Sequence, residues 1–130
     1  MEKGIILKKL RSTFETQSLI VNAPKEYLEM IEGLPFNSDS SHKKNYYDYM
    51  QIFATSKKEL VQLLEQHLSS GKYDCLFWIC YPKGGGSIKS DLNRTIVWET
   101  AAVLNIRPVT NVAINETWSA LRMRPVEMVK

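Results

Sequence analysis

Hydrophobic residues along the chain follow two alternating spacings. Runs of consecutive or alternating apolar residues, typical of β-strands, occupy residues 18–23, 46–54 and 74–81. Each run is followed by a segment with an apolar residue every three to four positions, which is typical of an amphipathic helix. The pattern therefore predicts that strands and helices alternate through most of the chain.

The predicted helix after the first strand has clear signals at both ends. Pro24 suits the first position of a helix, and Gly33 suits its end. Within this helix, Tyr27, Leu28 and Ile31 are spaced to point inward.

Three further helices are predicted from similar signals. Residues 56–59 (Ser-Lys-Lys-Glu) form a capping box at the start of a helix that ends at Gly71. Ser90 is predicted to cap a helix that extends to about Leu104. Residues 5–14 carry apolar side chains at helical spacing and predict a short helical lead-in.

The last part of the chain predicts two strands. Residues 107–115 and 118–124 alternate, and the tight turn between them indicates an antiparallel hairpin. The order of elements predicts the α/β class: a three-layer, Rossmann-like domain of about five strands, mostly parallel, with helices on both faces and a C-terminal antiparallel hairpin. The polar segment 37–45 is predicted to be a loop between elements, so residues 1–130 form a single domain.

Composition fits a globular protein, with 44% hydrophobic and 24% charged residues. No apolar run approaches the roughly 20 residues of a membrane span, and the N-terminus has no signal-peptide pattern. We therefore expect a soluble, cytoplasmic protein without membrane contact. Cys75 and Cys80 lie five positions apart in one strand, so they point to opposite faces and are expected to be reduced thiols.

The net charge of +3 is too small to indicate a nucleic-acid-binding protein, but its distribution is uneven. Residues 1–80 contain ten Lys or Arg and ten Asp or Glu, whereas residues 81–130 contain seven and four. This excess in the last part of the chain favours a local anion site over a generally basic surface.

The predicted topology indicates where such a site would lie. Ligands of open α/β sheets bind beyond the carboxyl ends of the strands. Four segments should meet at that edge of the sheet: residues 22–25, 55–56, 81–90 and 115–118.

The segment 83–91 is the strongest candidate for the anion site. It joins the central strand to a predicted helix N-terminus, where free N–H groups and the helix dipole favour an anion, and Lys83, Lys89 and Arg94 add positive charge. It has no Walker spacing, and three successive glycines also suit a flexible connector. The candidate ligand-binding residues are Asn22, Lys83, Gly84, Gly85, Gly86, Ser87, Lys89, Asp91, Arg94, Glu116, Trp118 and Arg122.

Several of these residues also have structural interpretations. Asp91 and Arg94 are spaced for an ion pair on one helix face. Arg122 falls in a strand expected beside the central one, where an unpaired charge is costly, so we expect a carboxylate partner, Glu116 or Asp91. Arg122 would then either lock the hairpin or bind the carboxylate or phosphate of a ligand. Trp118 is expected to pack in the core, although it lies at the ligand edge.

Catalytic and metal chemistry have little support in the sequence. His42 and His67 are both expected at the edge opposite the candidate ligand site, which disfavours a Ser-His-Asp arrangement. The His and Cys residues do not converge in the number that a metal site needs, so no metal is expected.

Five short motifs together resemble a bacterial family of small proteins of unknown function, over about residues 6–125. These motifs are Asn22-Ala23-Pro24-x-x-Tyr27, Tyr47-Asp48 leading to Phe53, Trp78-Ile79-x-Tyr81-Pro82-Lys83, Ser90-Asp91-Leu92-Asn93-Arg94 and Glu116-Thr117-Trp118-Ser119-Ala120-Leu121-Arg122. The chain departs from the family at Asn115, where an acidic residue is usual, and at residues 84–86, where the family has a serine-rich loop.

That family is similar to a shortened class I S-adenosylmethionine-dependent methyltransferase. The resemblance implies that strands 18–23, 47–53 and 74–81 stand for the first, fourth and fifth strands of the enzymes, and the hairpin for their last two. In those enzymes a glycine-rich turn after the first strand approaches the cofactor, and an acidic residue after the second strand holds its ribose. Residues 22–27 contain no glycine, and the second and third strands are missing, although Glu26 or Asp48 could replace the acidic residue. We therefore expect no S-adenosylmethionine and no other cofactor.

The leading hypothesis is a binding module without methyltransferase activity. It would hold a small anionic molecule or an acidic protein segment at residues 83–94, flanked by Asn22, Glu116 and Trp118. One alternative is a small transferase-type enzyme, which would need a perturbed Lys83 or a closed pocket containing Asp91 and Glu116. Another is a weak nucleic-acid binder using Lys83, Lys89, Arg94 and Arg107, whose affinity would fall steeply with salt. The oligomeric state is left open.

Overall fold

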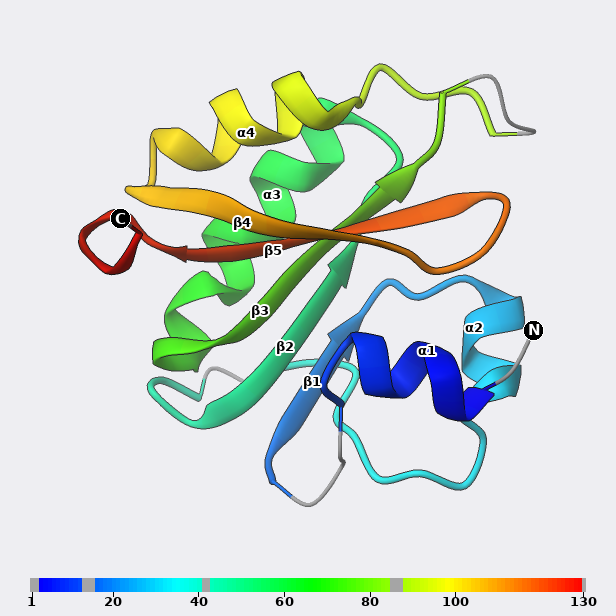
Figure 1. Ribbon diagram of the computed structural model, residues 1–130. Helices are drawn as coiled ribbons and strands as arrows, with labels where there is room; N and C mark the ends of the chain where they lie inside the picture. Colours follow the sequence, from blue (N-terminus) through cyan, green and yellow to red (C-terminus); the bar gives the residue numbers. More distant parts are fainter. Residues whose placement is uncertain (1–2, 13–15, 41–42, 85–87, 130) are drawn as a thin grey trace.

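The computed structural model describes residues 3–12, 16–40, 43–84 and 88–129. A single sheet runs through the molecule, with the strand order β1-β2-β3-β5-β4 (Figure 1). The strands are β1 (Ser18–Val21), β2 (Tyr47–Phe53), β3 (Gly71–Pro82), β4 (Ile106–Ala113) and β5 (Trp118–Pro125). β1, β2 and β3 pair in parallel, and β5 pairs antiparallel with both β3 and β4. The predicted mostly parallel sheet with a C-terminal hairpin is confirmed.

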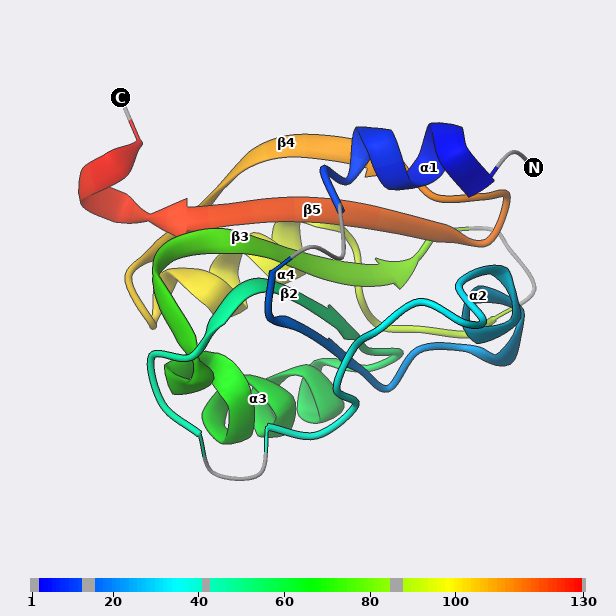
Figure 2. The ribbon, with the colours of Figure 1, turned by 90° about the horizontal axis from the view of Figure 1, so that it is seen from below.

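Helices cover both faces of the sheet, so the domain has three layers (Figure 2). They are α1 (Lys3–Lys9), α2 (Lys25–Met30), α3 (Lys57–His67) and α4 (Arg94–Ala102), with short 3-10 turns η1 (Leu68–Ser70) and η2 (Val126–Met128). α1 and α2 pack on one face and α3 and α4 on the other, each pair around its own cluster of buried apolar residues.

The central strand β3 serves both clusters because its side chains alternate between the two faces. Phe77 and Ile79 join the cluster under α3 and α4, whereas Trp78 and Cys80 join the cluster under α1 and α2. The indole Nε1 of Trp78 donates to the carbonyl oxygen of Leu10 at 2.9 Å, which fixes the C-terminal end of α1 over the sheet. The continuously apolar run of β3 therefore reflects burial on both sides.

The connection from β1 to β2 first passes the outer edge of β1. After α2, Asn37 forms an isolated parallel bridge with Leu19 of β1. Its N–H donates to the carbonyl of Ser18, and its carbonyl accepts from Ile20, both at 2.9 Å. The chain then crosses to β2. After β1 the chain first moves to the outer edge of the sheet, whereas after β2 it moves the other way, to β3. The carboxyl ends of β1 and β2 therefore flank the topological switch point of the sheet.

Two helices differ from the prediction: α4 begins at a different residue, and α2 buries fewer of its side chains. The N-cap of α4 is Asn93, whose side chain accepts from the N–H of Ile96 at 2.9 Å. The hydroxyl of Ser90 accepts instead from Leu92, two residues on, which is a local turn and does not begin a helix. In α2, Leu28 is 41% exposed, because only Tyr27 and Ile31 of the predicted inward set reach the core.

The predicted capping box at α3 forms in a shifted version. The Ser56 hydroxyl accepts from the N–H of Glu59 at 3.1 Å, as predicted. The Glu59 carboxylate accepts from the N–H of Thr55 at 2.8 Å, one residue before the cap. β3 also begins earlier than predicted, at Gly71, and Asp74 within it adopts a left-handed φ of 57°, next to a register irregularity with β2.

Candidate functional site

The carboxyl edge of the parallel strands brings together the four predicted segments. Pro82 at the end of β3 pairs with Trp118 at the start of β5. The N–H of Lys83 donates to the carbonyl of Thr117 at 2.8 Å, which ties the loop after β3 to the turn between β4 and β5. Asn22 and Thr55 follow β1 and β2 at the same edge.

Asn22 connects the two strand ends at the topological switch point. Its φ of 61° lies in the left-handed region, which asparagine tolerates better than most residues. Its side-chain Nδ2 donates to the carbonyl oxygen of Phe53, the last residue of β2, at 2.9 Å. The amide of Asn22 therefore links the carboxyl ends of β1 and β2.

Aromatic side chains pack beneath this edge. The ring centroids of Tyr27 and Phe53 are 5.1 Å apart, and those of Phe53 and Trp118 are 5.2 Å apart in an edge-to-face contact. Trp118 is 3% exposed, and its buried Nε1 has no hydrogen-bond partner among the described residues. Trp118 is therefore a core residue at the base of the edge and is not open for stacking with a ligand.

Lys83 and Lys89 meet at one small hollow after β3. The hollow has a volume of about 260 Å³. Its described lining residues are Pro82, Lys83, Gly84, Ile88, Lys89, Ser90 and Leu92. Gly85, Gly86 and Ser87 lie outside the described residues. The helix after this loop begins at Arg94, three residues later than the cap predicted at Ser90 implies, and the Asn93 side chain accepts from one of its N–H groups, that of Ile96.

Asp91 contacts a different helix from the one that was predicted. Its Oδ1 accepts from the N–H of Lys57, the first residue of α3, at 2.8 Å. Asp91 lies before α4, so it does not share a helix face with Arg94, and no ion pair joins them in the described part of the chain. The carboxylate instead satisfies a free N–H group at the positive end of α3.

Arg122 lies away from the loop. It pairs in register with Trp78 of β3 and Thr110 of β4, four residues along β5 from Trp118 and thus roughly 13 Å from the carboxyl edge. Among the described residues no carboxylate is within ion-pair distance of it, so the predicted pairing with Glu116 or Asp91 is wrong. The rise along β5 sets this separation, because Glu116 lies exposed in the turn at the end of the hairpin, six residues before Arg122.

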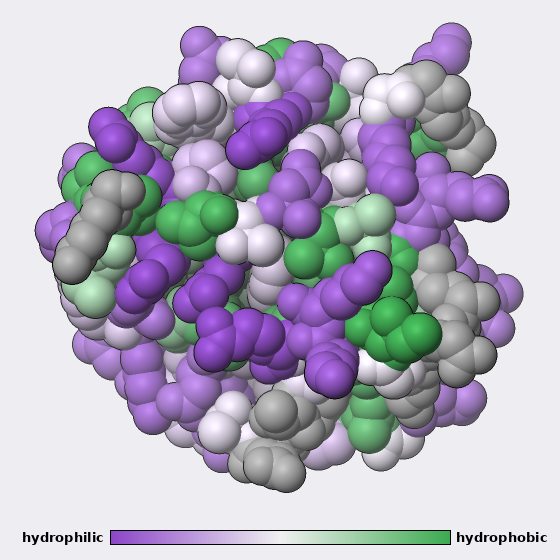
Figure 3. Space-filling model, viewed as in Figure 1, coloured by the Kyte–Doolittle hydropathy of each residue, from purple (hydrophilic) through white to green (hydrophobic). Residues whose placement is uncertain are grey.

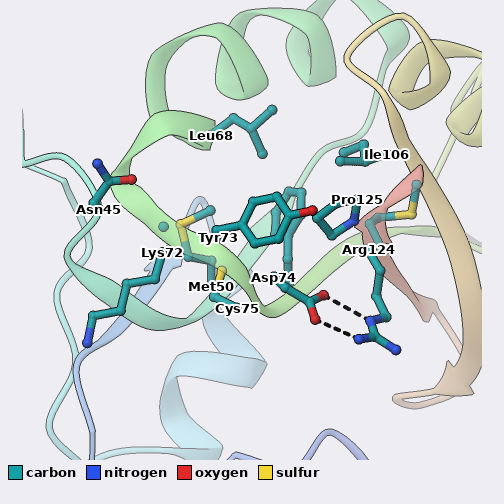
Figure 4. A pocket seen from close by; sticks show the side chains of 13 residues that line it. Asn45, Met50, Leu68, Lys72, Tyr73, Asp74, Cys75, Ile106, Arg124 and Pro125 are labelled. Atoms are coloured by element: carbon teal, nitrogen blue, oxygen red, sulfur yellow. Dashed lines mark hydrogen bonds and ion pairs between the residues drawn. The ribbon is translucent and has the colours of Figure 1, made fainter. Parts of the chain in front are cut away.

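A nearby arginine does have a carboxylate partner. Arg124 donates through Nε and Nη2 to both oxygens of Asp74, at 2.9 and 2.6 Å. The Arg124 guanidinium lowers the pKa of Asp74 below its usual value. This pair stands at the rim of a hollow of about 230 Å³ near the amino ends of the strands, with Tyr73 and Cys75 also in its lining (Figure 4).

A buried hydrogen-bond network under α2 was not predicted from the sequence. The hydroxyls of Tyr27 and Tyr49 donate to Oε1 of Gln51, at 2.9 and 3.1 Å. Nε2 of Gln51 contacts Sγ of Cys80 at 3.4 Å. Burial is the main cause that raises the pKa of both tyrosines, and it raises the pKa of Cys80 to about 12. The one available signal was a glutamine between the apolar residues Met50 and Ile52 of the predicted strand.

His67 lies at the opposite end of α3 from the carboxyl edge, as predicted. It is buried, and its Nδ1 is 3.2 Å from the hydroxyl of Ser40. Burial lowers its pKa, and Asp39 opposes that shift. His42 lies outside the described residues. The described residues contain no group of three or more His, Cys, Asp or Glu side chains placed to hold a metal ion.

Several solved structures of SAM-dependent methyltransferases are similar to this chain. A SAM-dependent methyltransferase from Aquifex aeolicus matches with a TM-score of 0.65 and 13% identity, over 94% of this chain and 89% of that chain. One from Archaeoglobus fulgidus matches with a TM-score of 0.57 and 10% identity, over 94% and 92%. The chain has the fold of the class I methyltransferases.

A further similar structure is that of a methyltransferase with a named substrate. The 1,6-didemethyltoxoflavin-N1-methyltransferase of Burkholderia thailandensis, solved with S-adenosylhomocysteine, matches with a TM-score of 0.56 and 9% identity, over 95% of this chain and 76% of that one. No protein-family model and no curated protein sequence matches. No helix in the described residues has the length and apolar character that crossing a membrane requires.

Proposed function

We propose that this methyltransferase-like domain is a binding module that holds a small anionic molecule at the carboxyl edge of its sheet, and that it does not transfer methyl groups. The observation that carries the proposal is the shared hollow of Lys83 and Lys89, placed directly after the central strand. Ligands of α/β sheets bind at this edge, and two lysines in the lining of a hollow of about 260 Å³ favour a compact anion.

The residues at the end of β1 do not fit S-adenosylmethionine. The methyltransferase fold implies that the cofactor lies over this strand end, where a glycine-rich turn leaves room for it. Here a side chain stands at this position: the Asn22 amide hydrogen-bonds to the carbonyl of Phe53. The strand expected to carry the ribose-binding carboxylate is represented by the single bridge at Asn37. These two features support a function without the cofactor.

Isothermal titration calorimetry with pyrophosphate as the probe tests the anion site. We expect the double variant Lys83→Gln/Lys89→Gln to weaken the lysine-dependent binding at least tenfold, because both cations of the hollow are lost. Lys44→Gln is the matched control, since Lys44 is an exposed lysine on the loop before β2 and its substitution removes the same type of charge. Unchanged affinity in the double variant would contradict the proposal.

The alternative is a divergent transferase, which the structurally similar methyltransferases favour. The same calorimetric assay distinguishes it from a binding module. Titration with S-adenosylhomocysteine should give no heat if the Asn22 side chain occupies the space that the cofactor needs. Saturable binding of S-adenosylhomocysteine would favour the transferase.

A further inference from the structure

Four arginines gather on the sheet face that α1 only partly covers. In β5, Trp118 and Ala120 belong to the buried cluster on the α1 side, so Arg122 and Arg124 point to that side as well. Arg107 of β4 is directly opposite Arg124 in register. Arg11 follows α1 and lies close enough to Arg122 to affect its ionisation. We call Arg11, Arg107, Arg122 and Arg124 the arginine face.

The charge of the arginine face is poorly compensated. Within the described residues its one ion pair is Arg124 with Asp74. The Nε of Arg122 is buried and has no hydrogen-bond partner among those residues. Burial, followed by the charges of Arg11 and Arg124, lowers the pKa of Arg122. Like charges directly opposite each other on adjacent strands, such as Arg107 and Arg124, are also destabilising. On the face of the molecule in Figure 3, strongly hydrophilic residues lie across the middle, with apolar residues between them.

A hollow beside the arginine face contains a second unsatisfied polar group. Its volume is about 340 Å³, and its described lining residues are Arg11, Thr16, Ser18, Asp48, Tyr49 and Leu76. Ser18 is only 4% exposed, and its hydroxyl has no hydrogen-bond partner in the described part of the chain. Ser18 points to the α1 side because Ile20, two residues along β1, belongs to that buried cluster. Buried hydroxyls without partners are rare in native proteins, and a ligand is one way to satisfy them.

We propose that the arginine face and the adjoining hollow form a second ligand site, which binds a small phosphate-bearing molecule. Guanidinium groups bind phosphate oxygens through paired N–H donors, and the Ser18 hydroxyl is able to donate to a further oxygen. The hollow is near the lower limit of small-molecule sites, which is roughly 300 Å³. This site lies on the face of the sheet and is independent of the lysine hollow at the carboxyl edge.

The structure favours a small ligand over a nucleic acid. Asp48 stands in the wall of the hollow and, with Lys72 at 2.8 Å, leaves that side without a net positive charge. The arginines are thus confined to one side of the hollow, whereas the backbone of a nucleic acid needs positive groups along a continuous track.

The test is calorimetric titration of pyrophosphate into the full chain carrying Lys83→Gln/Lys89→Gln, which removes the lysine hollow from the measurement. Adding Arg122→Gln should weaken binding at least tenfold, and adding the exposed Arg107→Gln should weaken it several-fold. Adding Lys58→Gln should leave it unchanged, because Lys58 is an exposed residue of α3 on the opposite face. Arg122→Gln should also melt at or above the temperature of its parent without ligand, because it removes a partly buried charge that has no ion-pair partner among the described residues. A purely structural arginine would give a lower melting temperature.

Three results would overturn the proposal. The first is the loss of all pyrophosphate binding in Lys83→Gln/Lys89→Gln alone, which would leave one anion site and support only the proposed function. The second is an affinity that neither Arg122→Gln nor Arg107→Gln changes; if Arg122→Gln does not fold, Arg107→Gln decides. The third is an arginine-dependent affinity for a short RNA with no affinity for pyrophosphate, which would identify a polyanion surface.

Discussion

Two polar side chains at the carboxyl edge bind backbone groups of neighbouring elements. Asn22 donates to the carbonyl that ends β2, and Asp91 accepts from the N–H that begins α3. Both residues were predicted as ligand contacts, and their side chains are instead engaged within the protein. Among the described side chains that remain able to meet a ligand at this edge are the two lysines of the hollow.

Replacing Asp91 with alanine should lower the free energy of unfolding by about 1 kcal/mol, as expected for the loss of a side-chain acceptor at a helix N-terminus. Urea unfolding followed by circular dichroism measures this change. Glu116→Ala is the matched control, because Glu116 is exposed in a turn and its loss should change stability by less than about 0.5 kcal/mol. Equal effects of the two substitutions would contradict the capping role.

The two cysteines should be unreactive in the folded protein. Burial raises the pKa of Cys75 to about 11 and that of Cys80 to about 12, so at pH 8 almost no reactive thiolate is present. A thiol-specific chromogenic reagent should label neither residue quickly at pH 8 and should label both in denaturant. Rapid labelling of Cys80 in the native state would show that the core under α2 opens.

Most strands and helices, and the order in which they follow each other, could be predicted from the sequence. The strands were found because burial on both faces gives a continuous apolar run, as in β3, and burial on one face gives alternation. The start of α4 was misplaced because Ser90 and Asn93 are equally good caps, and packing against the sheet decides between them. The carboxyl edge was predicted. The contact of Asp91 with α3, and the lack of a carboxylate near Arg122 among the described residues, were not predicted, since both depend on how distant elements pack together.

The buried network of β2 and α2 should be cooperative. Gln51→Leu removes the acceptor of the Tyr27 and Tyr49 hydroxyls, and an unsatisfied buried donor costs about 1–3 kcal/mol. We expect a loss of stability of about 2 kcal/mol or more in urea unfolding. Adding Tyr27→Phe and Tyr49→Phe should recover part of that loss, because the orphaned hydroxyls are then gone. A triple variant less stable than Gln51→Leu would argue against this network.

For the whole molecule, His67 should make stability depend on pH. Burial lowers its pKa from the ordinary value of 6.5, so the unfolded chain binds more protons than the folded chain as pH falls below about 6.5. The free energy of unfolding should therefore decrease as pH falls through that value toward the lowered pKa of the folded state. Asp48 and Asp74 have pKa values lowered from 3.8, so they contribute only at more acidic pH.

Urea unfolding at pH 7.5, 6.5 and 5.5 measures this dependence. The His67→Gln variant should show a flatter profile than the wild type over this range, whatever its stability at pH 7.5. Parallel profiles for the two proteins would mean that other groups cause the dependence.

The outer side of β1 is an almost unpaired edge of the sheet, because Asn37 is the single residue that bridges to it among the described residues. All four residues of β1 are buried, yet beyond it the sheet continues through one residue only. The segment that follows Asn37 is therefore the natural position for grafting additional strands onto this domain. Asn37 already supplies the register for an incoming strand, so a strand–helix–strand insert placed there would extend the sheet without disturbing the order β1-β2-β3-β5-β4.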